Sequence, residues 1–143
     1  MTKEVRLTVR GVQVQEDKTE ENMEVVSVGQ MYEKNGFVCL NFEEVVDESE
    51  SGVVQVVKNL MKIRNDQVEL IKRGPTESHM VFVPDRATYT YYSTPLGELE
   101  VSIFTKQIQR QQKPNGFRLV LEYDLEMNQT FITQCCVDIE VEQ

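Results

Sequence analysis

The chain has 143 residues, of which 40% are hydrophobic, and it carries a formal net charge of −9. Nucleic acids and anionic membrane surfaces are poor partners for so acidic a chain, because both are bound by basic patches. No apolar run approaches the ~18 residues that span a bilayer, and the polar start lacks the apolar core of a signal peptide. We therefore expect one cytoplasmic domain that binds neither nucleic acid nor membrane.

The balance of small apolar residues indicates the fold class. Valine occurs 21 times and alanine once, at Ala87. Valine is stiff about χ1 and suits a pleated sheet, whereas alanine is the best helix former. A domain of this length with helices would carry several times more alanine. The composition therefore predicts an all-β fold.

Turn signals divide the chain into about ten strand-like runs with alternating apolar and polar residues. We predict strands over residues 4–14, 23–34, 37–46, 53–64, 67–73, 78–83, 86–94, 98–110, 117–127 and 131–141. Asn35-Gly36 is the strongest hairpin signal, since both residues tolerate a positive φ. A two-residue loop there places Met31 opposite Leu40.

The run 53–64 also fits a helical stripe, but its four valines favour a strand. Short turns between successive runs imply antiparallel neighbours in a meander, and about ten such strands curl. Closing the sheet removes its exposed edges. We therefore favour an up-and-down antiparallel barrel of about 8–10 strands over a two-sheet sandwich, with residues 1–143 as a single domain.

Matching the apolar faces of the last two strands predicts their register. A three-residue loop at 128–130 joins the two faces and sets Tyr123 opposite Cys135. The same register sets Arg118 opposite Glu140 on the wet face, a favourable cross-strand pair.

No catalytic constellation is evident in the sequence. His79, the sole histidine, alternates with the apolar face of its run and is expected to point outward. The carboxylates of the last two strands alternate with core residues, so they are expected on the solvated face: Glu122, Asp124, Glu126, Asp138, Glu140 and Glu142. We therefore expect a protein that is not an enzyme.

The three cysteines predict neither a disulfide framework nor a metal site. Cys135 and Cys136 are adjacent on a strand, so their side chains leave opposite faces. The third, Cys39, is distant in sequence, and no C-x-x-C spacing exists. We interpret all three as small hydrophobic residues, and we expect no metal and no cofactor.

Several segments resemble the YwiB-like family of uncharacterised bacterial proteins. They are GQMYEKNG at 29–36, LIKRG at 70–74, SHMVF at 78–82 and, above all, YSTPLGELE at 92–100. The resemblance covers nearly the whole chain, and it implies a lipocalin-like (calycin) β-barrel with an internal pocket. Relatives tend to carry arginine where this chain has Lys72, so an arginine-based ligand clamp does not carry over unchanged.

We expect this barrel to bind a small apolar or amphipathic ligand in its interior. Lys72 shares its face with core residues, so it is expected to snorkel from the rim or to meet an acidic or ligand group inside. Lys72, Thr105 and Thr133 are the expected polar handles. The expected apolar lining is Met31, Leu40, Met80, Leu99, Val101, Tyr123 and Leu125.

The alternative is an interaction or structural protein with a filled barrel. Phe104, Ile108, Val120 and Ile132 fall on the wet side of their strands, and an outer apolar patch predicts a homodimer. A bulge in the run 98–110 would instead turn Phe104 or Ile108 back into the core. A cavity of ~300 Å³ or more favours ligand binding over a filled barrel.

Overall fold

The computed structural model describes residues 1–15, 17–48, 52–74, 77–94, 97–127 and 130–143, with residues 46–48, 53, 92–94, 131 and 132 described by their backbone alone. One antiparallel sheet of ten strands forms a nearly closed barrel, and its strand order is β6-β5-β4-β3-β2-β1-β10-β9-β8-β7. The strands are β1 (Lys3–Gln15), β2 (Glu20–Lys34), β3 (Phe37–Glu48), β4 (Val53–Arg64), β5 (Gln67–Arg73), β6 (Ser78–Phe82), β7 (Ala87–Thr94), β8 (Gly97–Lys113), β9 (Gly116–Met127) and β10 (Thr130–Glu142).

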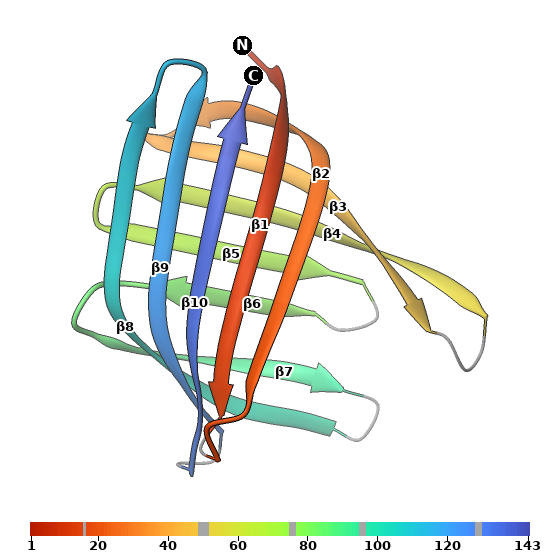
Figure 1. The fold of residues 1–143 in the computed structure, drawn as a ribbon, viewed down its shortest axis with the longest axis vertical. Coiled ribbons are helices and arrows are strands. Elements are labelled where there is room, and N and C mark those ends of the chain that lie inside the picture. Colours follow the sequence, from red (N-terminus) through yellow and green to blue (C-terminus); the bar gives the residue numbers. More distant parts are fainter. Residues whose placement is uncertain (16, 49–51, 75–76, 95–96, 128–129) are drawn as a thin grey trace.

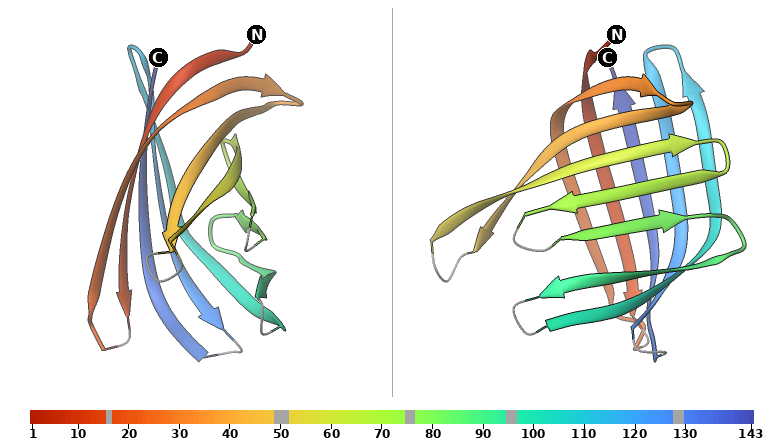
Figure 2. Two further views of the ribbon diagram at one scale, coloured as in Figure 1. Left: turned by 90° about the vertical axis from the view of Figure 1, so that its right-hand side faces the viewer. Right: turned by 180° about the vertical axis from the view of Figure 1, so that it is seen from behind.

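The barrel consists of two layers whose strands cross at a steep angle. Strands β1, β9 and β10 form one layer with parts of β2 and β8, and strands β3 to β7 form the other (Figure 1). Figure 2 shows the two layers edge-on, with β2 and β8 bending from one layer into the other. Edge strands β6 and β7 follow each other through a turn in which the Arg86 amide donates to the Val83 carbonyl.

All ten predicted strands are present, and the ambiguous run 53–64 is a strand. The Asn35-Gly36 turn has positive φ values of 54° and 81° and sets Met31 opposite Leu40, as the hairpin signal predicted. The all-β barrel is therefore confirmed. A single ten-stranded sheet forms both layers, so the alternative of a two-sheet sandwich is wrong.

Two local features, a glycine in β2 and a β-bulge in β8, bend these long strands. Gly29 lies at the bend of β2, where a Cβ atom would come within 2.5 Å of the Asn41 carbonyl oxygen. In β8 the register shifts between Thr105 and Gln107, which marks a β-bulge at Lys106. The bulge reverses the faces of the strand beyond it, so Ile108 lies opposite Leu121 and packs against the core.

The last hairpin corrects one prediction. Thr130 pairs with Met127, so two residues rather than three separate the strands; Asn128 and Gln129 themselves lie outside the described residues. The register then shifts between Phe131 and Thr133. This shift restores the match of apolar faces, because a bulge adds one residue to one strand.

The predicted pairs beyond that shift are confirmed: Tyr123 lies opposite Cys135, and Arg118 lies opposite Glu140. The Arg118 guanidinium nevertheless binds the neighbouring Asp138 carboxylate, with Nε 3.0 Å from Oδ1. Glu140, which lies opposite Arg118 on β10, instead forms ion pairs with two other residues. Its Oε1 atom lies 3.6 Å from Arg10 Nη1 and 3.7 Å from Lys113 Nζ.

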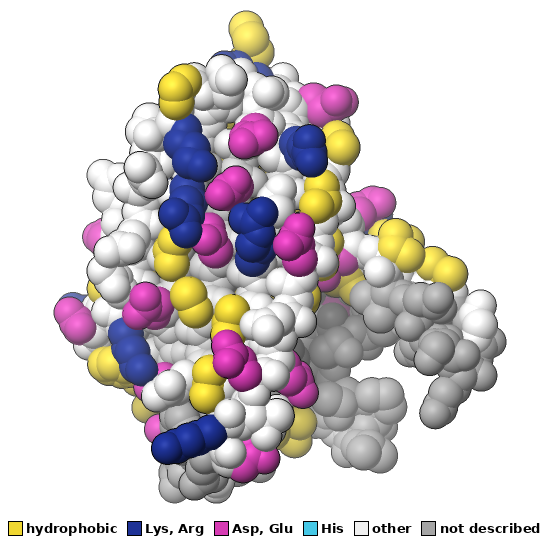
Figure 3. All heavy atoms as spheres, in the orientation of Figure 1, with side chains coloured by type: hydrophobic (Ala, Val, Ile, Leu, Met, Phe, Trp, Pro, Cys, Tyr) yellow, Lys and Arg dark blue, Asp and Glu magenta, His cyan; other side chains and the backbone are white. Residues whose placement is uncertain are grey.

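The outer face of β1, β8, β9 and β10 carries interspersed charges of both signs (Figure 3). Lys106 contacts Asp124 there at 3.1 Å, and Arg10 contacts Glu24 at 3.4 Å. On the predicted solvated face of the C-terminal strands, Asp124, Asp138 and Glu140 therefore form ion pairs. Such exposed pairs contribute little individually.

Candidate functional site

A cavity of about 330 Å³ lies between the two layers of the barrel. Strands β1, β2, β9 and β10 form one wall, and β3 to β6 form the other. Its lining is mostly apolar and includes three methionines, whose flexible thioethers adapt to irregular shapes. The lining residues are Val9, Gly11, Val12, Gln13, Glu21, Asn22, Met23, Phe42, Glu44, Asn59, Met61, Leu70, Lys72, Met80, Tyr123, Leu125, Cys135, Cys136, Val137 and Ile139.

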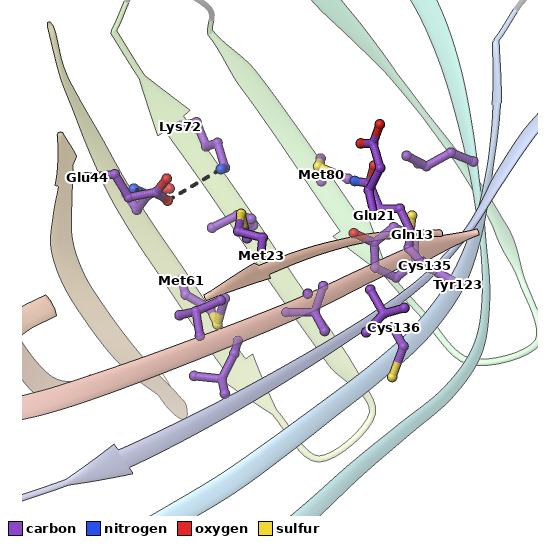
Figure 4. A pocket seen from close by; sticks show the side chains of 18 of the residues that line it. Gln13, Glu21, Met23, Glu44, Met61, Lys72, Met80, Tyr123, Cys135 and Cys136 are labelled. Carbon is purple, nitrogen blue, oxygen red and sulfur yellow. Dashed lines mark hydrogen bonds and ion pairs between the residues drawn. The ribbon is translucent and has the colours of Figure 1, made fainter. Parts of the chain in front are cut away.

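The cavity extends to the place where β2 and β3 separate. Within the described residues, the ladder between these strands ends at Gly29 and Phe42, and only β1 pairs with the first part of β2. The Ser27 hydroxyl donates to the Glu43 carbonyl at 3.1 Å, close to this branch point. Beyond it, the exposed Glu21 and Met23 of β2 face Glu44 across the cavity (Figure 4). We interpret the separation as the cavity mouth.

Polar side chains gather at one end of the cavity, on β3, β4 and β5. Asn59 Nδ2 donates to Glu44 Oε1 at 3.0 Å, and Lys72 Nζ lies 3.5 Å from the same oxygen. Asn59 lies opposite both Phe42 and Lys72 in the ladders, so these three side chains share the inner face. Figure 4 shows the Lys72–Glu44 ion pair at this end.

The opposite wall holds Cys135 beside Tyr123, its ladder partner. Burial raises the pKa of the Cys135 thiol to about 11, and a hydrogen bond with Tyr123 only partly opposes this effect. A thiol with so high a pKa stays protonated at neutral pH and is a poor nucleophile. The Tyr123 ring in turn packs edge-on against Phe82 at 4.8 Å between centroids, which fixes this wall.

The structure brings together four of the ten predicted lining residues, namely Lys72, Met80, Tyr123 and Leu125. Lys72 also meets an acidic group inside the barrel, as its position in the core-facing row predicted. The other six lie apart from the cavity. Among them, Leu40, Val101, Thr105 and Thr133 are buried in packed regions, while Met31 and Leu99 are half-buried.

Sequence reasoning missed Gly11, Met23, Glu44 and Asn59. Gly11 lies in the middle of a strand and has no side chain. A Cβ atom added at Gly11 would lie 3.4 Å from Met23 Cε. A glycine within a strand signals a close approach or an open space, and this signal was available. Asn59, a polar residue among the valines of its run, was a second signal. The mouth depends on where the ladder ends, which strand patterns do not reveal.

The predicted outer apolar patch is only partly present. Phe104 is 42% exposed and Val120 is half-buried, while the side chain of Ile132 lies outside the described residues. The prediction that Ile108 faces outward is wrong. The bulge at Lys106 turns its side chain inward, as the alternative of a bulge in the run 98–110 predicted. His79 points outward, and its Nε2 lies 3.2 Å from Glu69 Oε1.

The described residues contain no group of three or more His, Cys, Asp or Glu side chains that could hold a metal ion. The same residues contain no helix long and apolar enough to cross a membrane.

The nearly closed ten-stranded sheet and the absence of helix among the described residues define this molecule as an all-β barrel protein. A model of the family described as "Domain of unknown function (DUF1934)" matches residues 7–139, and the chain belongs to this family. The resemblance to YwiB-like proteins found in the sequence is confirmed by two further comparisons.

The chain is similar to the "Uncharacterized beta-barrel protein YwiB" of Bacillus subtilis (strain 168). The two are 27% identical over 121 residues, which cover 85% of this chain and 80% of the relative. The crystal structure of the ywiB protein from Bacillus subtilis superposes with a TM-score of 0.80 at 25% identity. That match covers 99% of this chain and 94% of the other.

Proposed function

We propose that this protein binds a small apolar or amphipathic ligand inside the barrel and is not an enzyme. The observation that carries the proposal is the cavity of about 330 Å³, because a barrel packed solid by its own side chains would leave no such space. Its walls combine flexible methionines with a few polar groups at one end, an arrangement typical of binding pockets.

The cysteines support a cytoplasmic location for this activity. Cys39, Cys135 and Cys136 are all free thiols, and unpaired cysteines are typical of a reducing compartment. Fractionation of cells that express the protein at its natural level tests this part of the proposal. Recovery from an oxidising compartment would contradict it.

The test of ligand binding is native mass spectrometry of the protein purified from its own host, paired with the variant Gly11→Leu. Gly11 lines the cavity, and its added side chain would meet the flexible end of Met23. The added carbons fill the cavity, so we expect the co-purified ligand to be lost while stability rises by about 0.5–2 kcal/mol. Val120→Leu, on the outer face, is the matched control and should retain the ligand. Equal ligand content in both variants would contradict the proposal.

A second candidate function is self-association through the outer surface. Beyond Phe104, large apolar side chains are exposed on neighbouring strands: Val26 and Val28 on β2, Val45 on β3, and Val54 and Val56 on β4. Exposed apolar patches often mark interfaces. A stable interface buries about 1,600 Å² and would persist at ~100 μM, so a strictly monomeric sedimentation profile at that concentration would rule it out.

A further inference from the structure

One edge of β2 has no neighbouring strand at the cavity mouth. β1 pairs with residues 20–31 of β2 without a register shift, whereas β3 pairs with β2 only from Gly29 onward. Within the described residues, the other edge of residues 20–28 therefore lacks a partner strand, and we call it the free edge. β3 and β4 project away from β2 there (Figure 1). The seam between β6 and β7 differs, because the Thr88 hydroxyl donates across it to the Val81 carbonyl.

The free edge lacks the features that normally protect an exposed strand. Edge strands are usually blunted by lysine, proline or a β-bulge. Residues 20–28 have the sequence EENMEVVSV, which contains neither lysine nor proline, and their pairing with β1 has no bulge. Val26 and Val28 are 54% and 68% exposed, and Val45 of β3 is exposed across the gap. An unprotected edge with apolar side chains beside it favours pairing with another strand.

A groove marks the point where β2 and β3 separate. Its volume is about 390 Å³, and its lining consists of residues 28–30 of β2, residues 41–43 of β3, and Lys58 and Asn59 of β4. The Ser27 hydroxyl donates to the Glu43 carbonyl beside it, so a side chain rather than a backbone amide satisfies this carbonyl. The groove gives room for the end of a strand that is added to the free edge.

The charges around the gap determine which strand fits. Glu21 and Glu44 lie on opposite sides of the cavity mouth (Figure 4). Lys72 pairs with Glu44, but no lysine or arginine of the described residues forms an ion pair with Glu21. Glu20 and Glu24 are exposed and add negative charge to β2. A second copy that added its own β2 would bring the same carboxylates to this edge, and like charges on paired strands are destabilising. A basic strand would meet opposite charges instead.

We propose that the free edge binds an extended basic segment of another protein, which adds to the sheet as a strand beside residues 20–28. Side chains of an added strand alternate between its two faces. The lysine or arginine side chains of the segment point inward, between Glu21 and Glu44, and its apolar side chains cover Val26 and Val28. Its main chain supplies the hydrogen-bond partners of the free edge. This interaction does not require a ligand in the cavity.

The first experiment measures the binding of labelled peptides to the full chain by fluorescence anisotropy. The test peptide alternates lysine and valine and is as long as the free edge. One control peptide has glutamate in place of every lysine, and the other has the test sequence with N-methylated backbone amides. The N-methylated peptide keeps the charge but cannot donate main-chain hydrogen bonds. We expect the test peptide to bind at least about tenfold tighter than either control.

Each of the other outcomes would overturn the proposal. Equal binding of the N-methylated peptide would show that general attraction to an acidic protein explains the affinity. Equal binding of the glutamate peptide would show that the edge does not select basic segments, and no binding of the test peptide would show that the edge takes no such strand. A dimer of the protein alone that Val26→Lys dissociates would show that a second copy occupies the edge.

The second experiment protects the free edge with a charge. Val26→Lys adds a cation beside the added strand, as natural edge strands often do, and should weaken binding of the test peptide about tenfold. The fold should be unaffected, because Val26 is exposed. Tyr89→Lys adds the same charge at an exposed position of edge strand β7, so it is the matched control and should change the affinity by less than about twofold. Equal weakening by both variants would contradict binding at β2.

A charge reversal tests the contact on the inner face. Glu21→Lys should weaken binding of the lysine peptide and strengthen binding of the glutamate peptide, so that the ratio of their affinities changes by about tenfold. Glu100→Lys, at an exposed position of β8, is the matched control and should change this ratio by less than about twofold. A ratio that Glu21→Lys leaves unchanged would overturn the inward placement of the basic side chains.

Discussion

The two ends of the barrel interior differ in how completely side chains fill them. Near the chain termini, Leu7, Leu40, Leu119 and Val141 have no measurable exposure, and Ile63 has 1%. At the other end, the same strand β1 presents Gly11 and Gln13 to an open cavity. One sequence of alternating residues thus builds a packed region and an open region along a single strand. The difference arises from side-chain size and from the separation of β2 and β3.

Truncating one apolar side chain at each end should give the largest difference in the free energy of unfolding. Leu119→Ala removes a fully buried side chain, and we expect the free energy of unfolding to fall by about 2–5 kcal/mol. Leu125→Ala removes a half-buried side chain that borders the existing cavity, so the loss should be about 1 kcal/mol. Urea denaturation of both variants measures the difference. Equal losses would show that the two ends are packed alike.

Replacing one glycine in each region by alanine should change stability in opposite directions, by smaller amounts. Gly29→Ala places a Cβ 2.5 Å from the Asn41 carbonyl oxygen, so the bend of β2 must shift, at a cost of about 1–3 kcal/mol. Gly11→Ala meets only the movable end of Met23 at 3.4 Å and should stabilise by about 0.4–1 kcal/mol. Thermal unfolding gives both signs. Destabilisation by Gly11→Ala would contradict the open space at this position.

The Lys72–Glu44 pair should contribute less than a buried ion pair. Breaking a fully buried pair costs about 3–5 kcal/mol. The Lys72 side chain, however, is 33% exposed at the cavity, so we expect Lys72→Met to cost only about 1 kcal/mol. Lys58→Met, at an exposed position of β4, is the control and should be neutral. A loss above about 3 kcal/mol would mean that the pair is shielded from water.

The smallest effect concerns the thiol in the cavity wall. Because the pKa of Cys135 is raised to about 11, roughly one thiol in a thousand is ionised at pH 8, and alkylation should be slow. The unfolded thiol loses its proton at a lower pH than the folded one. This group's contribution to stability is therefore intact at neutral pH and is lost as the pH rises through about 11. Mass spectrometry after alkylation measures the rate, with the urea-unfolded chain as control. Equal rates in both states would contradict a buried thiol.

Much of the fold followed from local sequence signals. The Asn35-Gly36 turn determined the register of its hairpin, and face matching gave Tyr123 opposite Cys135. Both signals act over a few residues and depend on the period of two in a strand. The last loop was wrong because a two-residue turn with a bulge gives the same register as a three-residue turn. Face matching does not distinguish these two solutions.

The site was less predictable for a physical reason. Residues that face inward are the same whether the interior is filled or open, so Thr105 and Thr133 were assigned to the cavity although both are buried elsewhere. The course of β8 beyond Lys106 and the end of the β2–β3 ladder determine where space remains. These features result from strand bending in three dimensions. Lys72 was found because its charge interrupts a core-facing row.

The order of the strands has a consequence for the speed of folding. In the described part of the chain, every strand pairing but one joins strands that are neighbours in sequence. The exception is β1 with β10, which pair from Arg6 with Glu142 to Gln15 with Thr133. Closing so long a loop is entropically unfavourable and slows folding. A circularly permuted chain that joins the present termini and begins at β7 would turn this pairing into an ordinary hairpin. Every strand pairing would then be an ordinary hairpin, and stopped-flow refolding should be faster than that of the natural order.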